Sequence, residues 1–296
     1  MSDARFDLLP KNPDPTAKGR FPSWLHRRLP TGNTLKKTGE LLGKAKLNTV
    51  CEEAKCPNLF ECWSKKTATF LVMGKECTRN CGFCAIDFSK APAPLEEDEP
   101  SRVAASVAAL ELKHVVITMV ARDDLPDGGA AHLAKVIDAV RLTSPSSTIE
   151  VLTSDFSGNT NAWEIIANKK PDIFNHNIET VRELSPRVRH KATYDRTLSL
   201  LSYMKKAGLR VKSGLMVGLG ETEAQVHATL NDLQASGCDI VTIGQYLQAD
   251  KRKLRVKAFI EPAQFESYRI FGENLGMRVF SGPFVRSSYN AELFIR

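Results

Sequence analysis

The sequence predicts an α/β protein, namely a partial (β/α)6 TIM-like barrel with N- and C-terminal extensions. From residue 68 onward, apolar runs rich in β-branched residues alternate with segments of helical periodicity. This alternation is typical of parallel strands joined by right-handed crossover helices. Six β-α units can be found, too few to close an eight-unit barrel. We therefore expect an open barrel, with a doubly wound sheet as the alternative.

The N-terminal extension, residues 1–66, is expected to wrap around the barrel. Its first 50 residues are rich in Pro, Lys and Arg, and one helix is predicted at Thr34–Gly43, with Thr34 as N-cap and Gly43 at the end. The first residues lack the apolar stretch of a signal peptide, and their acidic residues argue against a transit peptide. We therefore expect a cytoplasmic protein.

The barrel itself is predicted over residues 67–260. Its strands are expected at Ala68–Met73, His114–Val120, Thr148–Thr153, Ile173–Ile178, Arg210–Val217 and Ile240–Leu247. Its helices are expected at about Ser101–Leu110, Ala130–Thr143, Asn161–Asn168, Asp195–Ala207 and Thr222–Ser236. Residues 261–296 are predicted to form the C-terminal extension. Ligands of such sheets gather at the carboxyl ends of the strands, so we expect the functional site there.

Charge and hydropathy limit the partners of the protein. Lys and Arg together number 41 against 34 Asp and Glu, which gives a net charge of +7 over 296 residues. This surplus favours an acidic partner, with simple solubility as the alternative. No stretch approaches the roughly 18 uninterrupted apolar residues of a membrane span, so no membrane partner is expected.

The cysteines carry the clearest chemical signal. Six of the seven lie between residues 51 and 84, and such clusters in a cytosolic chain indicate metal binding or catalysis rather than disulfides. They form two triplets, Cys51-x4-Cys56-x5-Cys62 and Cys77-x3-Cys81-x2-Cys84. Zinc sites are usually built from pairs such as C-x2-C, and neither triplet is a pair of pairs. Iron–sulfur clusters accept looser spacings, and three thiolates leave one iron open for another ligand.

The second triplet resembles the cluster loop of the radical S-adenosylmethionine superfamily. Its sequence is CTRNCGFC, with the aromatic Phe83 before the last cysteine, and it directly follows the first predicted strand. The resemblance implies that Cys77, Cys81 and Cys84 hold a 4Fe–4S cluster whose open iron binds the methionine moiety. It also implies that an electron from this cluster cleaves S-adenosylmethionine and releases a deoxyadenosyl radical.

Other segments are similar to lipoyl synthases and narrow the family. TVCEEAKCPNLFECW at Thr49–Trp63 resembles the segment that binds an auxiliary cluster in that family. Further similar segments follow in the family's order: LPTG at Leu29–Gly32, DDLPDGGA at Asp123–Ala130, FNHNIETV at Phe174–Val181, SGLMVGLGET at Ser213–Thr222, TIGQYLQ at Thr242–Gln248 and GPFVRSSYNA at Gly282–Ala291. The resemblance therefore covers nearly the whole chain.

The family resemblance implies a second 4Fe–4S cluster with a serine ligand. Its ligands would be Cys51, Cys56, Cys62 and a serine near the C-terminus, for which we favour Ser288, with Ser287 as the alternative. A serine oxygen is a harder donor than a thiolate and suits this cluster less well. We therefore expect the cube to be easier to take apart at that corner, in keeping with its implied use as the sulfur source.

The implied reaction inserts two sulfur atoms, at C6 and C8 of an octanoyl chain attached to a lysine of a carrier protein. The implied partners are octanoylated lipoyl domains (of 2-oxoacid dehydrogenase E2 or the glycine cleavage H protein), an electron donor such as ferredoxin or flavodoxin, and an iron–sulfur carrier protein. No nucleic-acid partner is expected. The bond breaking belongs to the cofactors, so no side chain is assigned as acid or base.

Contacts to S-adenosylmethionine are expected at the carboxyl ends of two strands and beside the cluster loop. Asn175, Asn177 and Glu179 alternate along the fourth predicted strand, so they are expected to point to one face, whereas His176 would face the other way and serve packing. Asp123, Asp124, Gly128 and Gly129 follow the second predicted strand, and the glycines there would permit close approach of the methionine moiety. The alternative is a plain βα turn in which an Asp caps the next helix. The expected contact residues are Phe83, Asp123, Asp124, Gly128, Gly129, Asn175, Asn177 and Glu179.

One segment departs from the family pattern. At Ala249–Val256, Ala249 and Arg255 stand in place of prolines and Lys253 in place of a histidine. The basic residues of this stretch usually form a solvated face, but we predict that they meet the acidic surface of the carrier. Two further alternatives stay open: the same radical chemistry on another substrate, as in biotin synthase or tRNA methylthiotransferases, and a zinc module that binds nucleic acid.

Overall fold

The computed structural model describes residues 21–26, 34–64, 69–289 and 291 of the chain. The predicted family segment Leu29–Gly32 lies outside these residues. In the described part of the chain, no helix combines the length and the apolar character needed to cross a membrane.

A single eight-stranded sheet forms the centre of the fold, in the order β1-β2-β5-β6-β7-β8-β9-β10. Its strands are β1 (Asn48–Thr49), β2 (Thr69–Val72), β5 (His114–Met119), β6 (Thr148–Leu152), β7 (Ile173–Asn175), β8 (Val211–Val217), β9 (Ile240–Gln245) and β10 (Arg278–Gly282). β1 pairs antiparallel with β2, and every other pair is parallel. Two short strands, β3 (Glu76–Cys77) and β4 (Asp87–Phe88), pair with each other in the loop after β2.

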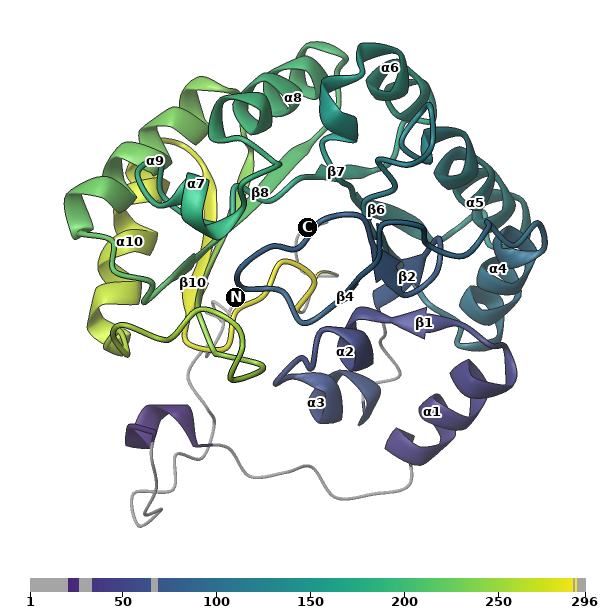
Figure 1. Ribbon diagram of the computed structural model, residues 1–296, viewed down its shortest axis with the longest axis horizontal. Helices are drawn as coiled ribbons and strands as arrows, with labels where there is room; N and C mark the ends of the chain where they lie inside the picture. The colour runs from purple at the N-terminus through teal and green to yellow at the C-terminus, as the bar shows by residue number, and fades with distance from the viewer. Residues whose placement is uncertain (1–20, 27–33, 65–68, 290, 292–296) are drawn as a thin grey trace, which may run out of the picture.

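The helices are η1 (Ser23–Leu25), α1 (Thr34–Lys44), α2 (Val50–Glu53), α3 (Leu59–Ser64), α4 (Glu99–Ala109), α5 (Ala130–Thr143), α6 (Thr160–Asn168), α7 (Ser185–Val188), α8 (Tyr194–Lys206), α9 (Glu223–Ala235) and α10 (Pro262–Asn274). Of these, α4, α5, α6, α8, α9 and α10 surround the sheet on its outer side (Figure 1). Parallel strands that follow one another along the chain are neighbours in the sheet, and a doubly wound sheet would instead reverse its order. The partial barrel is therefore confirmed and the doubly wound alternative is wrong.

The ring is open between its first and last strands, and the N-terminal segment occupies that side. Figure 1 shows α2 and α3 at this opening, and the loop that carries β4 and the yellow segment that follows β10 inside the outline of the ring. The hydrophobic core lies mainly between the sheet and the helices α4 to α10. The inside of the ring is thus available for polar residues and for the site.

The structure adds a seventh parallel strand that the sequence analysis did not predict. β10 pairs with β9 over five residues, from Arg278 opposite Ile240 to Gly282 opposite Gly244, and α10 connects the two. The chain leaves β10 at its carboxyl end, on the same edge of the sheet as the other parallel strands. Its last described residues, 283–289, therefore start from the edge where the site is expected.

The fourth predicted strand is shorter than expected. β7 ends at Asn175, so the expectation that Asn177 and Glu179 continue a regular alternation is wrong. Asn175 lies opposite Lys212 but Glu179 lies opposite Leu215, so the first segment contains one residue more than β8 does. The Ser213 hydroxyl fills the interruption, since it donates to the carbonyl of His176 and accepts from the Ile178 amide. The backbone is thus bulged, and Glu179 has a positive φ of 68°.

Candidate functional site

The loop of the second cysteine triplet is fixed to two neighbouring strands. It begins at Met73, whose φ of 71° turns the chain sharply after β2 and whose amide donates to both carboxylate oxygens of Glu99, at 3.1 and 3.0 Å. Thr78, next to Cys77, donates from its amide and its hydroxyl to the carbonyl of Ala121, at 3.0 and 2.9 Å. The triplet is thereby held at the carboxyl end of β5.

Arg79 fastens the same loop from inside the triplet. Its buried guanidinium donates two hydrogen bonds to Asp123, at 2.9 and 2.7 Å, and lies 2.7 Å from Oδ1 of Asp155. Burial alone would raise the pKa of Asp123, but the Arg79 guanidinium holds it below its usual range. Asp123 therefore binds the loop of the second triplet, through Arg79, in this structure. The sequence analysis missed Arg79, although two signals were usable: an arginine between two cysteines predicted to bind a cluster, and an Asp after each of two strands.

The residues around Asp123 form a capped βα turn. Asp124 pairs with Arg122, and Asp127 accepts hydrogen bonds from the amides of Gly129 and Ala131 at 2.9 and 2.8 Å. This is the alternative of an Asp that caps the next helix, α5.

Two adjacent glycines of this turn are required by packing. Gly128 and Gly129 both have positive φ. A Cβ on Gly129 would lie 2.4 Å from the sulfur of Met73, and a Cβ on Gly128 would lie 3.1 Å from the ring of Phe156. The glycines thus allow the turn to approach the loop of the second triplet, and their contact with S-adenosylmethionine stays a prediction.

The three thiols of the second triplet influence one another. Burial raises the pKa of Cys81 to about 11 and that of Cys84 to about 12, and the nearby thiol of Cys77 adds to both shifts. Burial disfavours the thiolate, whereas a metal ligand must be deprotonated, so cluster binding here would release protons. Gly82 donates its amide to Val188, and Phe83 packs against the buried cluster of Val188, Leu219 and Tyr246.

The end of β7 lies beside this triplet. The Asn177 amide donates to Glu179 at 3.1 Å, and the buried Arg189 donates to the carbonyl of Asn177. Burial raises the pKa of Glu179 against the opposing charge of Arg189. The negative charge of Glu179 in turn adds to the raised pKa values of Cys81 and Cys84. Asn177 and Glu179 are thus brought to the second triplet despite the bulge.

Asn175 and His176 have other surroundings. Asn175 is fully buried and donates to Glu150 at 2.8 Å. His176 is buried, with Nδ1 2.8 Å from the carbonyl of Thr153, and burial lowers its pKa to about 4. The packing role expected for His176 is therefore confirmed.

The first triplet lies on two short helices and the turn between them, at the open side of the ring. Cys51 is in α2, which Thr49 caps by accepting the Glu52 amide at 3.3 Å. The amide of Cys56 donates to the carbonyl of Cys51 at 3.1 Å, and Cys62 belongs to α3. Burial raises the pKa of Cys51 to about 11, and the neighbouring Cys56 adds to the shift.

Contacts across more than 220 residues join the C-terminal segment, residues 283–289, to the first triplet. Asn58 donates to the carbonyl of Phe284 at 2.8 Å, over a separation of 226 residues. Tyr289 donates to the carboxylate of Glu61 at 2.9 Å, over a separation of 228 residues. Asn58 and Glu61 lie between Cys56 and Cys62, and Phe284 and Tyr289 lie on either side of the two serines. The structure therefore brings the serine pair close to the first triplet.

The two serines have different surroundings. The Ser287 hydroxyl donates to Oδ1 of Asn177 at 2.8 Å. The Ser288 hydroxyl has no hydrogen-bond partner among the described residues. Since Ser287 is already engaged, this difference favours Ser288 as the ligand. Asn177, which also contacts Glu179, connects the surroundings of the two triplets.

The donor set fits iron–sulfur clusters better than a single ion. All seven cysteines are free thiols. Over the described ranges, no three His, Cys, Asp or Glu side chains converge on one point as the ligands of a single metal ion do. The thiolates of a cube bind different irons and need not converge in this way. The three thiols of the second triplet, on one loop beside polar side chains, therefore fit a 4Fe–4S cluster.

A buried ion pair inside the barrel was not foreseen. Lys212 of β8 and Glu150 of β6 are both fully buried, with Nζ 2.8 Å from Oε1. The signal available in the sequence was a charged residue within each of two otherwise apolar strands.

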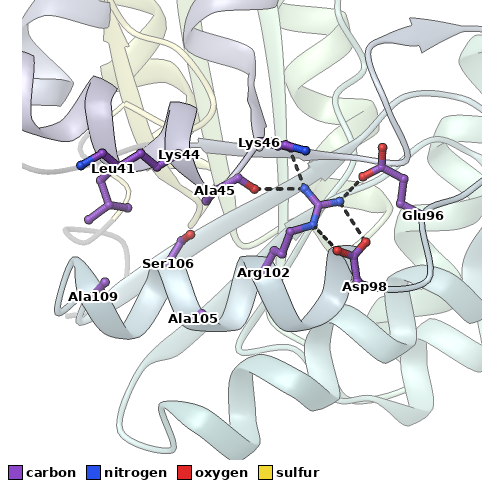
Figure 2. A pocket seen from close by; sticks show the side chains of 10 residues that line it. All are labelled: Leu41, Lys44, Ala45, Lys46, Glu96, Asp98, Arg102, Ala105, Ser106 and Ala109. Atoms are coloured by element: carbon purple, nitrogen blue, oxygen red, sulfur yellow. Dashed lines mark hydrogen bonds and ion pairs between the residues drawn. The ribbon is translucent and has the colours of Figure 1, made fainter.

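A separate groove lies between α1 and α4 (Figure 2), and no cysteine lines it. In it, Arg102 donates to the carbonyls of Ala45 and Lys46 at 3.0 and 2.8 Å and pairs with Asp98 at 3.0 Å. None of the residues predicted for the site lines this groove. Arg102 ties the N-terminal segment to the barrel.

Comparison with known proteins identifies similar families and folds. Residues 71–233, more than half of the chain, match the family "Radical SAM superfamily", and residues 9–56 match "N-terminal domain of lipoyl synthase of Radical_SAM family". The chain is 62% identical to the lipoyl synthase of Protochlamydia amoebophila, over 98% of this chain and 93% of that protein. It is 50% identical to the lipoyl synthase of Chlamydia muridarum, over 99% and 94% of the two chains.

Solved structures share the fold at low sequence identity. SuiB of Streptococcus suis bound to S-adenosylmethionine has a TM-score of 0.57 at 12% identity, over 76% of this chain and 53% of that one. Methylornithine synthase has a TM-score of 0.52 at 12% identity, over 83% of each chain.

Proposed function

The chain belongs to the lipoyl synthase family of the radical S-adenosylmethionine superfamily, and from this premise we propose which of its residues perform each part of the reaction. It is a sulfur-inserting enzyme that uses S-adenosylmethionine and two 4Fe–4S clusters. The reaction inserts sulfur at C6 and C8 of an octanoyl-lysine chain to form the lipoyl cofactor.

Cys77, Cys81 and Cys84 are assigned to the radical-generating cluster, and Cys51, Cys56, Cys62 and Ser288 to the auxiliary cluster. When bound, the first cluster supplies the electron that cleaves S-adenosylmethionine and the second supplies the sulfur. The observation that carries the assignment is the pair of hydrogen bonds from Asn58 to Phe284 and from Tyr289 to Glu61, which seat the serine segment against the first triplet.

The assignment divides the chain by task. Residues 1–66 and 261–296 together supply the ligands of the auxiliary cluster, and residues 67–260 supply those of the other cluster. Arg79 and Thr78 hold the loop of the second triplet at the carboxyl end of β5, so the three thiols that would bind this cluster have a fixed support. Rigid support of this kind preserves the distance between a reactive group and its substrate.

S-adenosylmethionine is placed beside the second triplet. Its contacts are assigned to Phe83, Asp123, Asp124, Gly128, Gly129, Asn175, Asn177 and Glu179. Support is strongest for Glu179 and Asn177, because the carboxylate of Glu179 interacts electrostatically with Cys81 and Cys84. A carboxylate and an amide there suit the amino group of the methionine moiety.

The macromolecular partners follow from the reaction. They are an octanoylated lipoyl domain, of the E2 component or the H protein, a ferredoxin or flavodoxin as electron donor, and an iron–sulfur carrier protein. A cytoplasmic location agrees with seven free thiols, since the cytosol keeps cysteines reduced.

Replacement of Cys56 by Ala tests the division between the clusters. Cys56 belongs to the first triplet only, so the variant is expected to hold about four fewer irons, to form deoxyadenosine normally and to form no thiolated product. The assay is an anaerobic single turnover with octanoyl-lysine peptide, S-adenosylmethionine and dithionite, analysed by mass spectrometry. Cys238→Ala, a buried cysteine outside both triplets, is the matched control and should keep both activities. Loss of deoxyadenosine formation in Cys56→Ala would contradict the proposal.

A further inference from the structure

The buried ammonium of Lys212 contacts the C-terminal segment, residues 283–289. Lys212 points into the barrel from β8, where its Nζ lies 2.8 and 3.0 Å from the two carboxylate oxygens of Glu150. The same Nζ donates to the backbone carbonyl of Ser287, in the C-terminal segment. Both side chains of the ion pair have no exposed surface. A fully buried charge pair thus holds a backbone group immediately before Ser288.

Glu150 is held in turn by its neighbours. Asn175 donates to its Oε1 at 2.8 Å, and Nε2 of His114 lies 3.6 Å from its Oε2. Burial alone would raise the pKa of Glu150, but Lys212 and His114 hold it below its usual range. Burial lowers the pKa of Lys212 to about 8, against the opposing effect of Glu150. A buried ion pair is a weak source of stability, so a specific positional task is the better explanation for it.

Two strand glycines leave room for the C-terminal segment inside the barrel. A Cβ on Gly244 of β9 would lie 2.1 Å from the carbonyl oxygen of Val285. A Cβ on Gly214 of β8 would lie 2.5 Å from Oγ1 of Thr242 on β9, 2.9 Å from Oδ1 of Asn177 and 3.0 Å from the Ser287 hydroxyl. Neither glycine has a positive φ, so close neighbours, rather than a turn, account for them: the segment at Gly244, and the segment together with Thr242 and Asn177 at Gly214.

We propose that Lys212, supported by Glu150, is a positioning residue that holds the C-terminal segment inside the barrel so that Ser288 faces the first cysteine triplet. The inference rests on the proposed function, since it takes Ser288 as the ligand of the auxiliary cluster. Lys212 is not one of the proposed cluster ligands or S-adenosylmethionine contacts. It acts through the Ser287 carbonyl, with Asn58 and Glu61 fixing the two ends of the same segment.

The test uses the full chain in its metal-free form and after cluster reconstitution. In Lys212→Met, the amides of Val285 and Tyr289 are expected to exchange hydrogen about tenfold faster or more, because one charged hydrogen bond to the segment is lost. The reconstituted variant is expected to hold about four irons and to keep deoxyadenosine formation. Because the single change leaves Glu150 without its cation, the double variant E150Q/K212M is measured beside it. Ile149→Ala is the control, since it removes a buried side chain of β6, the strand of Glu150, that packs in the main hydrophobic core.

Unchanged exchange at these amides in both Lys212 variants would overturn the proposal. Faster exchange with a full complement of irons would overturn it as well, because the cluster would then not need the anchored segment. Equal acceleration in Ile149→Ala would show general destabilisation and also refute it. The exchange measurement is made without metal, so its outcome is independent of whether Cys56→Ala separates the two clusters.

Discussion

Arg79 shows how one side chain can attach a loop to the ends of two strands, since Asp123 follows β5 and Asp155 follows β6. The Asp155 carboxylate that receives it is fully buried and also pairs with Arg196 at 3.1 Å. Burial alone would raise the pKa of Asp155, but Arg79 and Arg196 hold it below its usual range. The charged form of Asp155 is therefore the form that stabilises the fold.

Asp155→Asn is expected to lower the free energy of unfolding by about 3 kcal/mol at pH 7, because it removes one partner of a buried ion pair. A carboxyl whose pKa is lowered by folding stabilises the fold fully at pH values above its unfolded-state pKa of about 3.9. This stabilisation is lost as the pH falls through the pKa of the folded state. The difference between the two proteins should thus be constant from pH 7 to pH 5 and shrink below about pH 4. Denaturant unfolding at each pH measures it.

Asp138→Asn is the matched control for that experiment, since Asp138 pairs with Lys169 in exposed surroundings. Its effect should stay below about 1 kcal/mol. Equal losses in the two variants would mean that Arg79 does not depend on Asp155.

At the residue scale, the sequence identified what local spacing can encode. Cysteine spacing within one loop is visible in the sequence, and so was the serine pair once the family resemblance was known. Lys212 and Glu150 were not foreseen, because one charge in a strand does not reveal its partner on another strand. Asp127 accepts from the amides of Gly129 and Ala131 at the start of α5, whereas Asp123 and Asp124 bind arginines.

At the element scale, strands β8 and β9 are shaped by what lies inside them. Gly214 and Gly244 have no side chains where the C-terminal segment passes, so the backbone of this segment can lie close to the inner face of the sheet. In a packed barrel, these positions would carry bulky side chains.

Gly244→Ala is expected to displace the C-terminal segment, because the new Cβ would lie 2.1 Å from the Val285 carbonyl. The variant should bind about four irons instead of about eight after reconstitution while deoxyadenosine formation continues. Iron analysis and the single-turnover assay check this. Gly43→Ala, an exposed helix position with no atom within 4 Å, should leave both values unchanged. Full iron content in Gly244→Ala would show that the segment adapts.

Elements with a strong and regular pattern were predicted closely. α5 has the predicted bounds, and α9 begins after Thr222, where Thr222 and Gln225 cap each other as a capping box. β7 was predicted too long because the bulge depends on Ser213, which belongs to another strand. β10 was missed because Arg278–Gly282 contains two polar or charged residues and a glycine, and only pairing with β9 reveals it as a strand.

At the scale of the whole molecule, the basic loop after β9 lies next to the second triplet. The Leu254 amide donates to the carbonyl of Gly82 at 2.9 Å, and Lys253 donates to Asn80 at 3.2 Å. Lys251 and Arg255 are exposed and have no such contact with the cluster loop. A carrier that docks on them would therefore approach the mouth of the barrel.

Charge reversal at Lys251 and Arg255 is expected to lower kcat/KM for the octanoylated carrier about tenfold at low salt, because acidic partners are steered by such charges. The loss should diminish as salt increases, and turnover of a short octanoyl-lysine peptide should stay unchanged. Lys253 is left unchanged because it contacts Asn80 in the loop of the second triplet. A change at Lys253 could therefore alter cluster binding as well as docking. Reversal at Lys113 and Lys135, exposed residues on β5's amino side and on α5, gives the same change in net charge. Equal losses on carrier and peptide would refute steering.

The order of the parallel strands was predictable at this scale, because neighbouring β-α units pack in sequence. How the extensions meet was not. Asn58 and Phe284 are 226 residues apart, and no periodicity or composition relates them.

That long-range contact also has a consequence for biogenesis. A ribosome synthesises residues 51–62 more than 220 positions before residues 284–289, so a nascent chain contains the first triplet well before Ser288, the serine proposed to complete its ligand set. Under the proposed assignment, an auxiliary cube bound before the C-terminal segment is made would lack its oxygen donor. We therefore expect this site to be completed only after Ser288 has been synthesised.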